Sequence, residues 1–311
     1  MTRTISIVIP VFRSGDLLDA LYQRLLPVLS SLTTQWEIIL VDDASNDGTF
    51  DRMLELRHRD NRVKLIRFAR NMGQHHATLC GLQRATGDYI LTLDDDLQNP
   101  PEEIPRFLAK IDEGYDLVIG RITGEKKHNW FRNFASTAIQ TLVANILGKP
   151  KDLALSSYRA MTKRVVSGMV SYKGTHVYIP ALMLSSAPPE RICNISVPHN
   201  PRARGKSTYT LRKLLKLSSY LLINYSRFPL RFVTIWGFVV SLASFGFALF
   251  IVIKVLVYGS NFTGWPSLAV LISFLSGNIL FCIGILGEYI GRLVDESTKS
   301  SQFLIFEEHM Q

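Results

Sequence analysis

Short apolar runs and amphipathic segments alternate through the first part of the chain. Five runs have the continuous apolar character of buried β-strands, at residues 5–10, 36–41, 63–68, 89–93 and 116–120. Segments with apolar residues at helical spacing separate them, at residues 16–32, 48–59, 74–85 and 102–113. This alternation predicts an α/β domain built on a doubly wound parallel sheet. Ligands of such domains bind at the carboxyl ends of the strands.

The middle of the chain continues the pattern less regularly. The spacing predicts a helix over residues 130–147, a strand over 191–197 and a polar, basic loop over 198–208. Residues 210–224 place leucines among lysines and arginines, which predicts an amphipathic helix that lies in a membrane interface. A surface helix on the globular domain is the alternative interpretation of this last segment.

Two long apolar runs dominate the C-terminal third. Residues 232–253 and 265–287 contain no charged side chain, and each run is longer than the ~20 residues that a helix needs to cross the hydrocarbon core. A short connection at 254–264 joins them. The pattern therefore predicts a transmembrane helical hairpin, with a pair of buried core helices as the alternative.

Basic residues lie mainly on one side of this predicted hairpin. Those that flank it are Arg227, Arg231, Arg292 and Lys299, whereas the connection holds only Lys254. Because cytoplasmic ends carry the lysines and arginines, both termini and the α/β domain are expected on the cytoplasmic side. We therefore divide the chain into an α/β domain (1–205), a basic juxtamembrane segment (206–231), the hairpin (232–296) and a cytoplasmic tail (297–311).

The distribution of charge narrows the class of partner. The net charge is +9, and residues 202–231 hold eight Lys or Arg and no Asp or Glu, directly before the first long apolar run. A basic segment in this place favours phospholipid headgroups or a lipid phosphate over nucleic acid.

The three cysteines are far apart and show no metal-binding spacing, so we interpret them as free thiols in a reducing compartment.

Acidic turns follow two of the predicted strands. Asp42 and Asp43 come after the second strand, and Asp94, Asp95 and Asp96 come after the fourth. Carboxylates at positions i and i+2 can converge on one divalent ion, and hard oxygen ligands suit Mg²⁺ or Mn²⁺. Such an ion would hold a diphosphate and neutralise the charge of a departing nucleoside diphosphate. A solvated loop or a helix cap is the alternative for an acidic turn alone.

Several motifs together carry a family resemblance. They are VIPVF (8–12), VDDASNDGT (41–49), ARNMGQHHA (69–77), TGDYILTLDDDLQNPPEEIP (86–105) and LGEYIGR (286–292). With the predicted hairpin, these motifs resemble glycosyltransferase family 2 and its GT-A catalytic fold, and more narrowly its polyprenyl-phosphate branch. The resemblance implies an inverting transfer of sugar from a nucleotide-sugar, with UDP favoured over GDP, to undecaprenyl or another polyprenyl phosphate. It further implies a bacterial inner-membrane enzyme of envelope glycan or lipopolysaccharide modification, and we expect a homo-oligomer.

The resemblance also implies roles for individual residues in the donor site. The donor-binding residues would be Pro10, Val11, Asp42, Asp43, Arg70, Asp94, Asp95 and Ser207. Asp42 would hydrogen-bond the donor base, while Pro10 and Val11 would shape the base and ribose pocket. The metal ligands for Mg²⁺ or Mn²⁺ would be Asp94, Asp96 and Gln98.

Other implied roles concern the diphosphate and the acceptor. The arginines expected to act on phosphate groups are Arg121, Arg132 and Arg202, because guanidinium groups bind phosphate oxygens bidentately. Arg202 belongs to an Arg-x-x-Gly-x-Ser pattern on a loop that we expect to close over the donor. Asp152 is the candidate general base. Since a lipid monophosphate has a second pKa of about 6 and is largely ionised at neutral pH, Asp152 alternatively orients the acceptor or a metal.

Two positions depart from the family pattern. Arg13 stands where the family usually has Asn, and Thr208 stands where it has Lys. His75 and His76 are interpreted as donor-pocket or packing residues.

Two rival functions are considered. A processive polysaccharide synthase of the same family is one rival, but its Gln-x-x-Arg-Trp motif does not occur in this sequence. A non-catalytic membrane scaffold with a transferase-like domain is the other.

Overall fold

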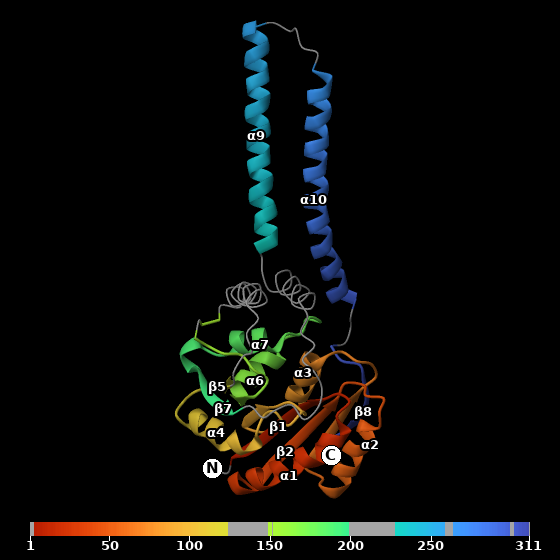
Figure 1. The fold of residues 1–311 in the computed structure, drawn as a ribbon, viewed down its shortest axis with the longest axis vertical. Helices are drawn as coiled ribbons and strands as arrows, with labels where there is room; N and C mark the ends of the chain where they lie inside the picture. Colours follow the sequence, from red (N-terminus) through yellow and green to blue (C-terminus); the bar gives the residue numbers. More distant parts are fainter. Residues whose placement is uncertain are drawn as a thin grey trace. The chain divides into compact units, whose positions relative to one another are not determined.

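The computed structural model describes residues 3–123, 149–150, 152–198, 228–258, 264–298 and 302–310. The chain divides into two compact units, shown as a ribbon in Figure 1. The first unit comprises residues 1–211 and 300–311, and the second comprises residues 212–299. The predicted helix at 130–147, the amphipathic helix at 210–224 and the basic loop beyond Pro198 lie outside the described residues.

The first unit is built on an eight-stranded sheet with the order β7-β5-β6-β4-β1-β2-β3-β8. The strands are β1 Thr4–Val11, β2 Gln35–Asp42, β3 Val63–Phe68, β4 Tyr89–Thr92, β5 Leu117–Thr123, β6 Arg159–Thr162, β7 Ile192–Pro198 and β8 Ile305–His309. All six strands predicted from the apolar runs are present, with ends that differ by no more than a few residues. The α/β fold class is therefore confirmed.

The sheet is mixed, which corrects the expectation of a parallel one. β6 lies between β4 and β5 and is antiparallel to both, and β8 is antiparallel to β3. The pairs β1–β2, β1–β4 and β2–β3 are parallel. Because β4 and β5 both oppose β6, they run in the same direction. The carboxyl ends of β1 to β5 consequently meet at one edge of the sheet.

Helices cover both faces of this sheet (Figure 1). Those described in the first unit are α1 Gly15–Leu32, α2 Thr49–Arg59, α3 Gln74–Arg84, α4 Ile104–Asp112, α6 Lys163–Val170 and α7 Ile179–Ser186. One apolar core joins α1, α2 and α4 to the sheet, and a second joins α3, α6 and α7 to its other face. Successive residues of β1 serve the two cores in turn, with Ile7 in the first and Val8 in the second, as strand geometry requires.

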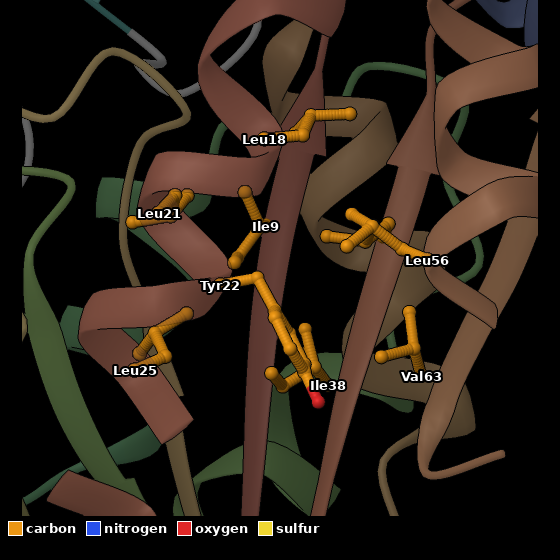
Figure 2. Close-up of a pocket in the computed structure, with 9 residues that line it drawn as sticks. Ile9, Leu18, Leu21, Tyr22, Leu25, Ile38, Leu56 and Val63 are labelled. Atoms are coloured by element: carbon orange, nitrogen blue, oxygen red, sulfur yellow. The ribbon is translucent and has the colours of Figure 1, made fainter. Parts of the chain in front are cut away.

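Figure 2 shows how α1 packs on the sheet. Leu18, Leu21 and Leu25 point from the helix toward Ile9 and Ile38 around an apolar cavity of about 10 Å³. This volume is at the lower limit for one water molecule, and the one hydroxyl in the lining, that of Tyr22, already donates a hydrogen bond to Asp60. We therefore assign the cavity to core packing and not to ligand binding.

The second unit contains two long helices, α9 Phe228–Tyr258 and α10 Trp265–Thr298. The segments Phe228–Lys254 and Val270–Gly291 are long and apolar enough to cross a membrane, and neither is buried within the protein. Their exposure argues against the alternative of a buried core pair. A hydrogen bond of 2.8 Å from Trp236 Nε1 to Asn278 Oδ1 joins the two helices.

The end of the chain contributes a strand that the sequence pattern did not predict. Residues 297–311 were expected to form a tail, but α10 continues to Thr298 and β8 pairs with β3. The pairing places Leu65 opposite His309 and Ile66 opposite Glu308. The sequence IFEEH contains two glutamates and shows no strand pattern of its own. The segment forms a strand because it pairs with the edge of β3.

Candidate active site

A cleft of about 490 Å³ lies at the carboxyl ends of the central strands. The residues that line it are Pro10, Val11, Phe12, Arg13, Ser14, Asp16, Leu17, Asp43, Asn71, Gly73, Gln74, Asp94, Asp95 and Asp96. They belong to the end of β1, to the loops that follow β1, β2, β3 and β4, and to the first turns of α1 and α3. Six of the residues expected to bind donor or metal thus line one cleft, although they are far apart in the sequence.

The loops around the cleft share an unusual backbone conformation. Arg13, Ala44 and Leu97 have positive φ values of 55°, 59° and 61°, and they follow β1, β2 and β4 respectively. Gly73, in the loop after β3, has a φ of 92°. Non-glycine residues rarely adopt this region, and such residues concentrate at functional sites.

Asp42 is fully buried at the end of β2. Its Oδ1 accepts the backbone N–H of Ser45 at 3.0 Å, and its Oδ2 lies 3.5 Å from Nε of Arg67. Burial raises the pKa of this carboxyl, while the hydrogen bonds from Ser45 and the charge of Arg67 act in the opposite direction. Among the described residues, no group donates a hydrogen bond to Oδ2. Asp42 therefore keeps one oxygen that can accept a hydrogen bond.

Asp43 uses both of its carboxylate oxygens to hold the loop that precedes α3. Oδ1 accepts the N–H of Met72 at 2.6 Å, and Oδ2 accepts the N–H of Gly73 at 2.8 Å. Asn71 Nδ2 donates to the Asp43 carbonyl at 3.2 Å. Burial raises the pKa of the Asp43 carboxyl. These contacts give Asp43 a positioning role in the cleft wall, in addition to any contact with a ligand.

The acidic turn after β4 is held by side chains from distant parts of the chain. Asp94 Oδ1 accepts Gln74 Nε2 at 2.5 Å, and its Oδ2 accepts the hydroxyl of Ser157. Burial raises the pKa of Asp94, and the charge of Asp96 raises it further. Asp96 Oδ1 in turn accepts the backbone N–H of Gln98 at 3.2 Å. The turn is therefore an ordered part of the site.

Asp95 fixes the loop after β1 to the acidic turn. Its Oδ2 accepts the N–H of Phe12 at 3.1 Å and the hydroxyl of Ser14. Burial raises the pKa of Asp95 to about 6, against the effect of these hydrogen bonds. The central aspartate of the turn thus links two walls of the cleft.

The donor atoms of the acidic turn fit a divalent cation that is shared with a ligand. Asp94 and Asp96 present hard carboxylate oxygens to one cleft. Within the described part of the chain, no group of three or more His, Cys, Asp or Glu side chains forms a complete metal cage. Mg²⁺ commonly uses one or two carboxylates and completes its shell with water and phosphate oxygens, so this incomplete set suits it.

The segment 152–158 connects the predicted general base to the acidic turn. Arg121 donates a hydrogen bond to the carbonyl of Asp152, so two predicted residues meet near the end of β5. Ser157 contacts Asp94 at the other end of the segment. In between, Asn194 of β7 accepts the N–H of Ala154 at 2.7 Å and donates to its carbonyl at 3.0 Å. Sequence reasoning missed Ser157 and Asn194, because neither belongs to a local chemical pattern.

A buried arginine lies behind the acidic turn. Arg159 Nε donates to Thr92 Oγ1 at 3.1 Å, and burial lowers the pKa of this guanidinium to about 10.

His75 packs edge-on against Tyr178 with 4.9 Å between the ring centroids. Burial, with a smaller effect from Arg159, lowers the pKa of His75 to about 4. His75 is therefore neutral near pH 7, which supports the packing interpretation.

The remaining predicted residues are not brought into the cleft by the described structure. Arg70 is exposed in the loop after β3 and does not line the cleft. The lining also does not include Asp42, Gln98, Arg121 or Asp152, of which Asp42 is fully buried. Arg132, Arg202 and Ser207 lie outside the described residues, as does the proposed closing loop at 202–209. Their roles stay predictions.

Comparisons with known proteins agree on the class of the chain. The family model described as Glycosyl transferase family 2 matches residues 6–170. An undecaprenyl-phosphate 4-deoxy-4-formamido-L-arabinose transferase from Edwardsiella ictaluri is 36% identical over 305 residues, which cover 97% of this chain and 93% of that protein.

Solved structures extend the likeness to the fold. Glucosyl-3-phosphoglycerate synthase from Mycobacterium tuberculosis, in complex with Mn²⁺, UDP-glucose and phosphoglyceric acid, has a TM-score of 0.52 at 17% identity, covering 71% of this chain and 79% of that one. The same enzyme with Mn²⁺, UDP and phosphoglyceric acid has a TM-score of 0.54 at 16% identity, covering 71% and 76%. At this level of identity the likeness concerns the fold alone.

Proposed function

The chain belongs to glycosyltransferase family 2, and from this premise we propose that it transfers a sugar from a UDP-sugar to undecaprenyl phosphate or another polyprenyl phosphate. A phosphate oxygen of the lipid attacks the anomeric carbon, and the bond from that carbon to the UDP oxygen breaks. The products are a polyprenyl-phosphate sugar with inverted anomeric configuration and free UDP.

One observation carries this proposal. The acidic turn of Asp94, Asp95 and Asp96 lines the same cleft as Pro10 and Val11, in a chain that aligns over 97% of its length with a transferase named for undecaprenyl phosphate. A cleft at the carboxyl ends of the central strands is where α/β sheets bind their ligands. The extent of the alignment favours a lipid-phosphate acceptor over the processive synthesis of a polysaccharide.

The donor end of the cleft is assigned to Asp42 and its neighbours. We infer that Oδ2 of Asp42, which forms an ion pair with Arg67 but accepts no described hydrogen bond, accepts an N–H group of the donor base, because a buried oxygen without a hydrogen bond is costly. Pro10 and Val11 would shape the pocket for base and ribose. Mg²⁺ or Mn²⁺, held by Asp94, Asp96 and Gln98, would supply positive charge to the leaving diphosphate.

The acceptor end is assigned to the arginines and Asp152. An ionised lipid phosphate is already a nucleophile near neutral pH, so the transfer does not require a strong base. Arg121, whose guanidinium lies against the carbonyl of Asp152, would bind a phosphate group together with Arg132 and Arg202. Asp152 would then orient the acceptor, and general-base action is its alternative role.

The two long helices provide a reason for a membrane-bound acceptor. We propose that α9 and α10 anchor the protein in the bacterial inner membrane, with the catalytic unit and both ends of the hairpin in the cytoplasm. An anchored enzyme meets its lipid substrate at high effective concentration. Reporter fusions after residue 311 and within residues 259–263 should report opposite sides of the membrane, and the same side for both would contradict this topology.

A direct assay tests the function. The purified protein in detergent is incubated with undecaprenyl phosphate, Mn²⁺ and each member of a panel of UDP- and GDP-sugars. We expect one nucleotide-sugar to yield a sugar-lipid and UDP in equal amounts. UDP release without a glycolipid, or growth of a polymer, would contradict the proposal. Asp96→Ala serves as the inactive control.

A further inference from the structure

The C-terminal segment 302–310, which we term the C-terminal brace, contacts β3 and α3, the two elements that flank the loop of Asn71 and Gly73 in the cleft lining. Its strand β8 pairs with β3, and the carbonyl of Leu304 accepts the N–H of Ala69 at 2.7 Å, at the first residue after β3. The buried ring of Phe303 stacks on Phe68 with 6.0 Å between centroids. The brace therefore supports the point at which the loop carrying Asn71 and Gly73 leaves the sheet.

The brace also contacts the helix that follows this loop. Arg84 of α3 forms an ion pair with Glu308 at 2.9 Å, and Gln83 Nε2 donates to Gln302 Oε1 at 3.1 Å. The opposite end of α3 begins at Gln74, which donates to Asp94 in the acidic turn. One side of the cleft is thus tied to the brace through β3, through the loop and through α3.

A single side chain of the brace reaches toward the buried Asp42. The ring of Phe306 lies 5.9 Å from the guanidinium carbon of Arg67, and the ring of Phe50 lies 4.8 Å from it. Arg67 Nε is 3.5 Å from Asp42 Oδ2, and its Nη2 donates to the Ser45 carbonyl at 3.3 Å. Two aromatic rings therefore flank the cation that forms an ion pair with Oδ2 of Asp42.

Phe306 is an exposed side chain, so its contact with Arg67 can be removed with little effect on stability. The side chain is 70% exposed, so its removal exposes little new apolar surface and should change stability little. A cation held near an aromatic face is attracted to the ring, and this attraction restrains a long, flexible arginine. An exposed phenylalanine in this place has little effect on the core but a direct effect on where Arg67 lies.

We propose that the C-terminal brace is a positioning element of the donor site, in which Phe306 holds Arg67 against Asp42 so that the pocket for the nucleotide base is formed before the donor arrives. This inference rests on the proposed function, since it takes Asp42 as the residue that receives the base. The brace touches neither the acidic turn nor the acceptor side in the described contacts. Its effect should therefore fall on nucleotide affinity and not on the transfer step.

The test measures UDP binding to the full-length protein in detergent with Mn²⁺ present. Phe306→Ala should weaken UDP binding roughly three- to tenfold, the range expected from loss of a cation–aromatic contact. Phe306→Tyr keeps the ring and should bind as the unaltered protein does. Leu304→Ala is the matched control, because Leu304 is also an exposed apolar residue of the brace, at 44%, and its described contact is through the backbone carbonyl.

The outcomes separate the inference from the function on which it rests. If the unaltered protein binds UDP and Phe306→Ala binds it as tightly as Leu304→Ala does, the brace has no positioning role and the inference is overturned. If the unaltered protein binds no nucleoside diphosphate with Mn²⁺, the proposed function itself fails.

Two further measurements sharpen the test. A chain lacking residues 302–311 should lose UDP binding, and if that chain does not fold, the point variants still decide between the outcomes. Turnover at saturating donor should be unchanged in Phe306→Ala, and a fall there with unchanged UDP affinity would overturn the inference.

Discussion

The α/β unit and the helical hairpin arrange their apolar side chains in opposite ways. In the α/β unit these side chains are buried on both faces of the sheet, as Ile7 and Val8 show at adjacent positions. In the hairpin, large apolar side chains such as Phe238 and Phe245 are exposed along α9. The hydrophobic effect drives the first arrangement in water, whereas a hydrocarbon solvent makes the second one favourable.

The α/β unit and the hairpin also differ in their polar contacts. The buried carboxylates Asp42 and Asp43 accept backbone N–H groups, and the acidic turn is held by three other segments of the chain. In the hairpin, a hydrogen bond from Trp236 to Asn278 joins the two helices. The α/β unit therefore depends on individual positions, while the hairpin depends mainly on length and composition. Substitutions should have very different effects in the two.

The largest expected effect is at the acidic turn. Asp96→Ala removes one of two carboxylates available to a divalent ion, and transfer should fall by at least about a hundredfold while the protein stays folded. Excess EDTA should abolish transfer in the unaltered protein, and added Mn²⁺ should restore it. Asp19→Ala, which removes an exposed carboxylate of α1 paired with Arg59, is the control and should be active. Full activity in EDTA would exclude the metal role.

A pair of identical substitutions tests the difference in burial. Phe107→Ala, at a fully buried position of α4, should lower the free energy of unfolding by about 3–5 kcal/mol. Phe238→Ala, at a position of α9 that is 70% exposed, should change it by no more than about 0.5 kcal/mol. Chemical unfolding of both variants in the same detergent makes the comparison. Equal losses would mean that α9 packs against protein in a way that the structure does not show.

A smaller effect is expected from a residue that acts through the backbone. Asn194→Ala removes the hydrogen bonds to Ala154 and Ile119 and frees the segment that carries Asp152. Small misplacements of reacting groups are costly, so we expect the turnover number to fall about tenfold, with UDP affinity unchanged. Steady-state kinetics with both substrates would show this division. A loss of UDP affinity instead would place Asn194 on the donor side.

The smallest effect should come from the hairpin. Asn278→Leu removes the hydrogen bond with Trp236, and measured bonds of this kind in membranes contribute about 0.6–2 kcal/mol. Sugar transfer should stay within about twofold of the unaltered protein. Thermal unfolding should show a slightly lower melting temperature, and Trp236→Phe should reproduce it. Loss of transfer in either variant would mean that the hairpin does more than anchor the protein.

The sequence predicted those parts of the fold whose signal is local. The strands β1 to β5 are mostly apolar runs, and burial between two helical layers is the reason for that pattern. β6 begins with Arg159, whose burial among Thr92, Ser157 and Met183 is a tertiary effect. A four-residue strand with a charged first residue has no local pattern by which to predict it.

The same distinction applies to the site. Asp94, Asp95 and Asp96 form a pattern within three residues, and the cleft contains all of them. Ser157 and Asn194 act on the site from 63 and 40 residues away in sequence from their partners Asp94 and Ala154. No spacing rule connects such positions, because the sheet alone brings them together. Sequence reasoning could therefore identify the reactive groups but not the side chains that hold them.

The late position of β8 in the chain has a consequence for biogenesis. Ribosomes synthesise β8 after both apolar helices, so the sheet lacks this strand until α9 and α10 have been made. During that interval β3 presents an unpaired edge, which is a template for pairing with other chains. Synthesis of the two helices therefore precedes completion of the sheet, and chains that stall after α10 should be recognised as unfinished by proteases and chaperones. Any fragment released before residue 302 would lack β8, and with it the C-terminal brace.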